Sequence, residues 1–140
     1  MALNFELLVQ SAGDGIIAAN DSGEIIFWNP AAERIFGFAA AEAIGQTLDL
    51  IVPERFRARH WEGYRKTMAT GSTRYASDIL RVPAHHKDGH MLSIAFTVAL
   101  LFSQEGKPEA IAAIVRDETA RWNEERELRR RLADLERQPK

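Results

Sequence analysis

The chain has 140 residues, of which 46% are hydrophobic and 27% charged, and a net charge of -2 at pH 7. These values are typical of one soluble globular domain and give no broad attraction to nucleic acid or to an anionic membrane. The absence of cysteine excludes disulfides, thiolate zinc sites, iron–sulfur clusters and thioether-linked cofactors. No apolar run approaches the roughly 18 residues of a membrane span, and the N-terminus lacks the features of a secretory signal. We therefore expect a cytoplasmic protein.

The first part of the chain predicts a short amphipathic helix, a tight hairpin and two brief helices. Turn residues at Asp21-Ser22-Gly23 join the two strands of the hairpin. Asn29 is a good helix N-cap and Pro30 a good first helical residue, so a helix is expected directly after the hairpin. In chain order the predicted elements are a helix at 3–11, strands at 15–20 and 24–28, and helices at 30–36 and 39–44.

The stretch 48–71 organises the rest of the chain. Residues 48–52 predict an extended segment, and Pro53 is tolerated as the first residue of a helix that ends at Gly71. Within this helix the apolar and aromatic positions are four residues apart, so they form one stripe on a helical surface. The stripe consists of Phe56, His60, Tyr64 and Met68. A histidine is therefore expected on the face that the helix buries.

From residue 74 onward the apolar pattern changes to a period near two. It predicts strands at 75–82, 91–102 and 110–116, separated by turn regions at 83–89 and 104–107. Five strands, with helices inserted between the second and the third, indicate an α+β fold. Its antiparallel sheet would have one face covered by the inserted helices.

The tail is charge-dense and predicts a long helix over 118–137. Leu128, Leu132 and Leu135 follow the four–three spacing of a short coiled-coil seam. Such a helix is marginal alone, so we expect it to pair with a second copy or with the N-terminal helix. The predicted organisation is a cap helix at 1–12, a core at 13–117 and a C-terminal helix at 118–140.

Several motifs follow one another in an order that resembles a PAS sensor domain over residues 3–120. They are N-P-A-A-E-R-I-F-G at 29–37, A-I-G-Q at 43–46, K-D-G at 87–89 and V-R-D-x-T at 115–119. The resemblance implies the PAS fold and a sensory module in signal transduction. It also implies a downstream output, such as the histidine kinase of a two-component system. Asp117 and Thr119 would form the signalling hinge, where either residue can cap the tail helix.

The segment P-E-R-F-R-A-R-H at 53–60 is similar to the helix of haem-binding, oxygen-sensing PAS domains in rhizobial sensor kinases. Carried over by position, His60 becomes the proximal ligand of a haem b iron that senses a diatomic gas or a redox state. Without cysteine the haem would be non-covalent, and flavin adducts are impossible. The basic residues that would meet the haem propionates are Arg57, Arg59, Arg65 or Lys66.

The resemblance also implies the remaining pocket residues. Together with His60 these are Tyr64, Ile79, Leu80, Met91, Ile94, Phe96 and Val98. Counting back from Lys87, the arginine that steadies bound oxygen in those kinases falls on Leu80. Arg81 should point to the opposite sheet face. An apolar distal wall would suit carbon monoxide or nitric oxide better than dioxygen, or leave the sixth iron position to Met91.

Other interpretations of the same residues stay open. The chain is alternatively a cofactor-free module for dimerisation or protein interaction, or a binder of another small apolar ligand such as a fatty acid. A homodimer would use Leu3, Phe5, Leu7 and Leu8 of the first helix and the leucines of the tail. His60 would then be a core histidine bonded to a backbone carbonyl. His85, His86 and His90 fit a solvated loop better than a metal site. No catalytic constellation stands out, so we expect no enzyme activity.

Overall fold

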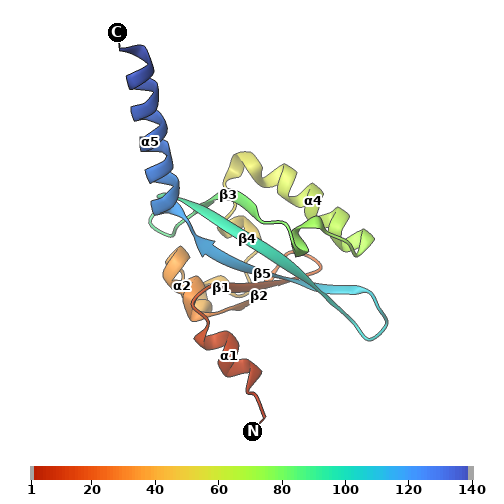
Figure 1. The fold of residues 1–140 in the computed structure, drawn as a ribbon. Coiled ribbons are helices and arrows are strands. Elements are labelled where there is room, and N and C mark those ends of the chain that lie inside the picture. Colours follow the sequence, from red (N-terminus) through yellow and green to blue (C-terminus); the bar gives the residue numbers. More distant parts are fainter. Residues whose placement is uncertain (1, 139–140) are drawn as a thin grey trace.

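The computed structural model describes residues 2–138 and confirms the predicted α+β fold (Figure 1). A five-stranded antiparallel sheet has the order β2-β1-β5-β4-β3. The strands are β1 (Gly15–Asn20), β2 (Ile25–Trp28), β3 (Leu80–His85), β4 (Met91–Phe102) and β5 (Pro108–Asp117). The α-helices are α1 (Phe5–Ser11), α2 (Pro30–Phe36), α3 (Ala40–Ala43), α4 (Arg57–Thr70) and α5 (Thr119–Arg137). Short 3-10 helices lie at Leu48–Leu50, Glu54–Phe56 and Arg74–Ala76.

The hydrophobic core lies between one sheet face and the helices that follow the hairpin. Trp28 of β2 and Phe36 of α2 pack with ring centroids 5.4 Å apart, and both side chains are buried. All five strands and the helices α2 and α3 contribute to this core, which consists of Ile17, Ile25, Trp28, Ala32, Phe36, Ala43, Ile51, Ala84, Leu92, Ile94 and Val115. Helix α4 contributes no residue to this cluster. The core is therefore packed mainly between the sheet and helices α2 and α3.

Asn29 ties the hairpin, α1 and α2 together and is completely buried. Its side-chain oxygen accepts from the Ala32 N–H at 3.0 Å, which makes it the predicted N-cap of α2, and from the Ile16 N–H at 2.8 Å. Its side-chain nitrogen donates to the carbonyls of Val9 and Asp14 at 3.0 and 3.1 Å. One amide therefore satisfies four backbone groups, a role beyond capping that the sequence did not indicate.

Two predicted segments around Pro53 are wrong in detail. Residues 48–50 form a 3-10 helix rather than extended chain. Pro53 precedes a second 3-10 turn at Glu54–Phe56, so α4 begins at Arg57 and not at the proline. The helix ends at Gly71 as predicted.

The third strand begins later and ends later than predicted. Residues 74–76 form a 3-10 turn, β3 starts at Leu80, and the strand continues through Pro83 to His85. Pro83 pairs with Ser93, where a turn region was expected. Because β3 is an edge strand, the missing N–H of Pro83 does not leave a gap in the sheet. The turn is consequently confined to the residues between His85 and Met91.

Helices α1 and α5 project away from the sheet at opposite ends of the molecule (Figure 1). Neither helix contains a buried residue. The prediction that α5 could pair with the N-terminal helix of its own chain is therefore wrong for this structure. The first residue of the predicted cap helix segment and the last two of the predicted tail segment lie outside the described residues.

Candidate functional site

Helix α4 is held against the β1–β2 turn by two aromatic side chains. The Trp61 indole N–H donates to Asp49 Oδ1 at 2.7 Å, and the Tyr64 hydroxyl donates to the Asn20 carbonyl at 2.5 Å. The Trp61 ring lies over Gly23, whose φ of 79° and lack of a Cβ leave room for it. These contacts fix which face of α4 turns toward the sheet. Burial, with a smaller effect from Asp21, raises the pKa of Tyr64 to about 12.

His60 lies on this same face, half-buried between aromatic neighbours. Its ring centroid is 4.7 Å from that of Trp61 and 5.8 Å from that of Tyr64. Burial lowers the pKa of His60, against a smaller opposing effect of Asp49, so the neutral imidazole is favoured. Its Nδ1 is buried, and the described residues give it no hydrogen-bond partner. The carbonyl bond that a purely structural histidine would make is therefore not formed at this atom.

The sheet is unevenly filled on its helix-covered face. Near α2 the inward side chains of Leu92, Ile94 and Val115 are only 2–4% exposed. Toward α4 the same face remains half-buried at Leu80, Val82, Phe96, Val98, Leu100, Ile111 and Ala113. Val82, Phe96 and Ala113 of this set still pack against the core cluster, so a flat apolar ligand would lie against partly exposed side chains of this face.

The strands bring most of the predicted pocket wall onto this one face. Leu80 pairs with Phe96, and side chains two residues apart share a face, so Ile94, Phe96 and Val98 line up beside Leu80. Arg81 lies on the opposite face, as predicted, where its Nε is 3.3 Å from Glu118 Oε2. Met91 also belongs to that opposite face and is 41% exposed, so the structure does not bring it to the predicted pocket wall.

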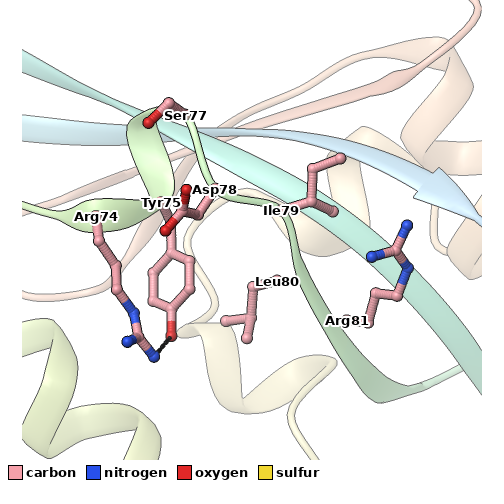
Figure 2. A pocket seen from close by; sticks show the side chains of 7 residues that line it. All are labelled: Arg74, Tyr75, Ser77, Asp78, Ile79, Leu80 and Arg81. Carbon is pink, nitrogen blue, oxygen red and sulfur yellow. Dashed lines mark hydrogen bonds between the residues drawn. The ribbon is translucent and has the colours of Figure 1, made fainter.

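An open hollow of about 610 Å³ lies beside the start of β3 (Figure 2). Its lining residues are Arg74, Tyr75, Ser77, Asp78, Ile79, Leu80 and Arg81. Figure 2 shows Arg74 reaching the Tyr75 hydroxyl, to which its guanidinium donates at 2.7 Å. Ile79 points away from Leu80 in the same view and is 54% exposed. Ile79 and Leu80 are thus adjacent in sequence but do not form one wall.

Among the basic residues predicted near a ligand, Arg57 is already engaged. Its guanidinium donates to the carbonyls of Val52 and Asp49 at 3.0 and 3.2 Å. Arg59, Arg65 and Lys66 are exposed on α4. These three side chains keep the reach to meet an anionic group at the edge of the site.

The predicted hinge joins β5, β4 and α5 through a compact set of hydrogen bonds. The Thr119 N–H and hydroxyl both donate to Asp117 Oδ1, at 2.9 and 2.5 Å. The Ser93 N–H donates to Thr119 Oγ1 at 2.9 Å, and the Glu118 N–H donates to the Ser93 carbonyl at 2.8 Å. The first residues of α5 are therefore bonded to β4, next to the pocket strand positions.

The turn between β3 and β4 contains a grouping that the sequence interpretation missed. His86, Asp88 and His90 bring their ligand-type atoms within 4.8 Å of one another. Asp88 was assigned to the turn and not to the histidines beside it. The alternation H-x-D-x-H was the signal that could have revealed the group, because alternate residues of a tight turn can converge.

Comparison with known proteins decides the family. The model of the PAS fold matches residues 3–117, which is most of the chain. The chain belongs to the PAS family. The PAS domain is a sensory fold and not a catalytic one. No helix among residues 2–138 is long and apolar enough to cross a membrane.

Two similar proteins carry the names of sensors, and both are much longer than this chain. The chain is 30% identical over 115 residues to the oxygen sensor protein DosP of Escherichia coli, covering 82% of this chain and 14% of DosP. It is 29% identical over 130 residues to the sensor protein FixL of Bradyrhizobium diazoefficiens, covering 92% of this chain and 24% of FixL. A PAS domain crystal structure from Colwellia psychrerythraea has a TM-score of 0.72 at 20% identity, covering 83% of this chain and 95% of that one. This PAS chain is thus a sensory signal-transduction module.

Proposed function

We propose that this PAS domain binds haem b through His60 and senses a diatomic gas or the redox state of the iron. The observation that carries the proposal is the buried, unpartnered Nδ1 of His60. A buried polar atom without a partner costs free energy unless a ligand satisfies it. The name of DosP, an oxygen sensor, and the resemblance of 53–60 to haem-binding PAS helices support the same function.

The residues around His60 fit such a group. The lowered pKa of His60 favours the neutral imidazole, which is the form that coordinates iron. The half-buried wall of Leu80, Phe96 and Val98 would pack against the porphyrin, and exposed Arg59, Arg65 or Lys66 would pair with its propionates. When bound, haem would supply an iron centre able to take a gas ligand.

A change at the pocket wall has a short route to α5. Leu80 is followed by Arg81, which contacts Glu118 on the other sheet face. Phe96 lies three residues from Ser93, which is bonded to Thr119. A shift of the Leu80–Phe96 pair would therefore alter the start of α5, and α5 would pass the change to an output such as a histidine kinase.

The test is a titration of the purified protein with haemin followed by absorption spectroscopy. Wild-type protein should develop a Soret band that saturates at one equivalent of haemin. His60→Ala should lower the affinity for haemin at least tenfold. His85→Ala is the matched control, because it removes an imidazole outside the site. A wild-type protein without a Soret band, or an unchanged His60→Ala titration, would refute the proposal.

A second function, dimerisation, is favoured by the exposed apolar residues of α1 and α5. Phe5 and Leu7 are 71% and 60% exposed, and Leu128, Leu132 and Leu135 are 58–64% exposed. Such stripes are costly in water unless a second copy covers them. We propose a homodimer through these helices. The dimer is compatible both with a haem sensor and with a cofactor-free module.

The dimer is tested by light scattering on the intact chain and on Leu128→Glu/Leu132→Glu. The wild type should have the mass of two chains and the variant that of one, while Arg131→Gln on the same helix leaves the mass unchanged. A wild type with the mass of one chain at tens of micromolar would contradict the dimer.

A further inference from the structure

The turn between β3 and β4 holds two imidazoles and a carboxylate in one small group. The rings of His86 and His90 stack with centroids 4.4 Å apart and an interplanar angle of 23°. Asp88 lies between them in sequence, and its Oδ1 contacts both rings, at 3.2 Å from His86 Nδ1 and still closer to His90 Nδ1. The three side chains therefore bring a nitrogen, an oxygen and a nitrogen within 4.8 Å of one another.

The group is fixed to the body of the domain, not carried on a free loop. The His86 side chain is only 21% exposed and lies against Gly37, the residue that ends α2 with a φ of 80°. A Cβ at position 37 would overlap the His86 ring. The Lys87 N–H donates to the Phe36 carbonyl at 2.9 Å, and Lys87 Nζ lies 2.5 Å from Glu42 Oε2. Much of the ordering that a ligand would require is thus already present.

The hydrogen bonds leave two electron-rich atoms facing each other. The Asp88 N–H donates to His86 Nδ1 at 3.1 Å, which assigns the free electron pair to that nitrogen. The same nitrogen is 3.2 Å from Asp88 Oδ1, which itself accepts the His90 N–H at 2.9 Å. Two acceptors at this separation repel each other unless a cation lies beside them. In the structure the His90 ring nitrogen, which lies still closer to Asp88 Oδ1, offsets this repulsion, and a bound cation would do so for both acceptors at once.

We propose that His86, Asp88 and His90 form a binding site for a divalent transition-metal ion of the Zn²⁺ type. Two imidazoles and one carboxylate suit zinc, nickel or copper, whereas calcium and magnesium prefer oxygen ligands throughout. Metal–ligand bonds of about 2.0–2.2 Å place ligand atoms roughly 3.4 Å apart in a tetrahedral site. The His86 Nδ1–Asp88 Oδ1 pair, at 3.2 Å, already has this spacing, so only the imidazole of His90 has to adjust. Rotation of His90, whose side chain is 53% exposed, supplies the adjustment, and water completes the coordination. The bound ion would lock the β3–β4 turn onto the end of α2.

This site is independent of the haem proposal, because His60 belongs to α4 and takes no part in it. The test is calorimetric titration of the purified protein with Zn²⁺, with Mg²⁺ as the comparison ion. We expect one Zn²⁺ per chain with micromolar affinity and no measurable Mg²⁺ binding. His90→Ala and Asp88→Asn should each weaken Zn²⁺ binding at least tenfold, and His86→Ala should do the same.

Two control variants, His85→Gln and His60→Ala, should bind Zn²⁺ like the wild type. His90 is the decisive position, since its side chain is 53% exposed and its replacement should leave the fold intact even where His86→Ala fails to fold. A Zn²⁺-dependent rise in melting temperature that is present in the wild type and absent in His90→Ala is the second readout. Unchanged binding in His90→Ala, equal loss in His85→Gln, or no binding by the wild type at millimolar Zn²⁺ would overturn the proposal.

Discussion

Replacing Asn29 tests whether one buried amide holds the hairpin, α1 and α2 together. Its four hydrogen bonds reach Ile16, Ala32, Val9 and Asp14, and the side chain has no exposed surface. Asn29→Ala removes all four hydrogen bonds at once and leaves their backbone partners in place. The variant should therefore lose more stability than the loss of a helix cap alone.

The expected loss follows from the groups left behind. Removing an N-cap costs about 1 kcal/mol. The Ile16 N–H and the two carbonyls would remain in a poorly hydrated place, and an unsatisfied buried polar group costs about 1–3 kcal/mol. We expect a total of roughly 3–4 kcal/mol, because partial relaxation reduces the simple sum. For a domain of this size that corresponds to a fall in melting temperature of roughly 10 °C.

Urea denaturation of wild type, Asn29→Ala and Asn29→Ser measures the effect. Serine can still cap Ala32 but is too short to reach Val9 and Asp14, so it should recover only about 1 kcal/mol. If Asn29→Ala costs no more than about 1 kcal/mol, or if serine restores nearly full stability, the bridging role is refuted and Asn29 is only a cap.

Three further predictions concern α4 and the pocket wall. Burial lowers the pKa of His60 below its ordinary value of 6.5, so the folded state resists protonation of this ring. The stability that depends on the neutral ring is therefore fully present above pH 6.5 and is lost as the pH falls through the lower, folded-state pKa. His60→Gln should flatten the decline of the melting temperature in acid, and an unchanged decline would contradict this. Leu80→Arg should slow oxygen release from the haem-loaded protein by roughly tenfold to a hundredfold, since one charge-assisted hydrogen bond contributes about 1.5–3 kcal/mol. Flash photolysis measures the release rate, and an unchanged rate would count against Leu80 as part of the pocket wall. Gly23→Ala should destabilise by about 1–3 kcal/mol more than Gly89→Ala, because both positions have a positive φ but only Gly23 lies against the Trp61 ring; equal thermal shifts would refute that contact.

The fold was predictable because its signals are local. Asn29-Pro30 before a helix, turn residues at 21–23 and the alternation in 91–102 each specify their element without reference to the rest of the chain. The errors arose where tertiary contacts decide. Pro83 looks like a turn residue, yet an edge strand tolerates it, and residues 74–79 alternate like a strand but lie before β3.

The candidate site was predictable in part, and the limit is geometric. The stripe of α4 indicated that His60 faces inward, and its Nδ1 is buried. Met91 is an odd number of residues from Ile94 and Phe96 in β4, so it lies on the other face of the sheet, and the sequence prediction overlooked this alternation. Asn29 was recognised as a cap, but its bonds to Val9 and Asp14 join segments whose proximity only the folded chain creates. The convergence of His86, Asp88 and His90 was missed for the same reason.

The most direct test of the central claim is chemical rescue at position 60. His60→Gly should lose haem affinity, and added imidazole should restore a Soret band and a five-coordinate ferrous spectrum by replacing the missing ring. Restoration by imidazole and not by a similar concentration of pyrrole is the predicted result. A His60→Gly protein that binds haem as well as the wild type, with or without imidazole, would show that His60 does not hold the iron.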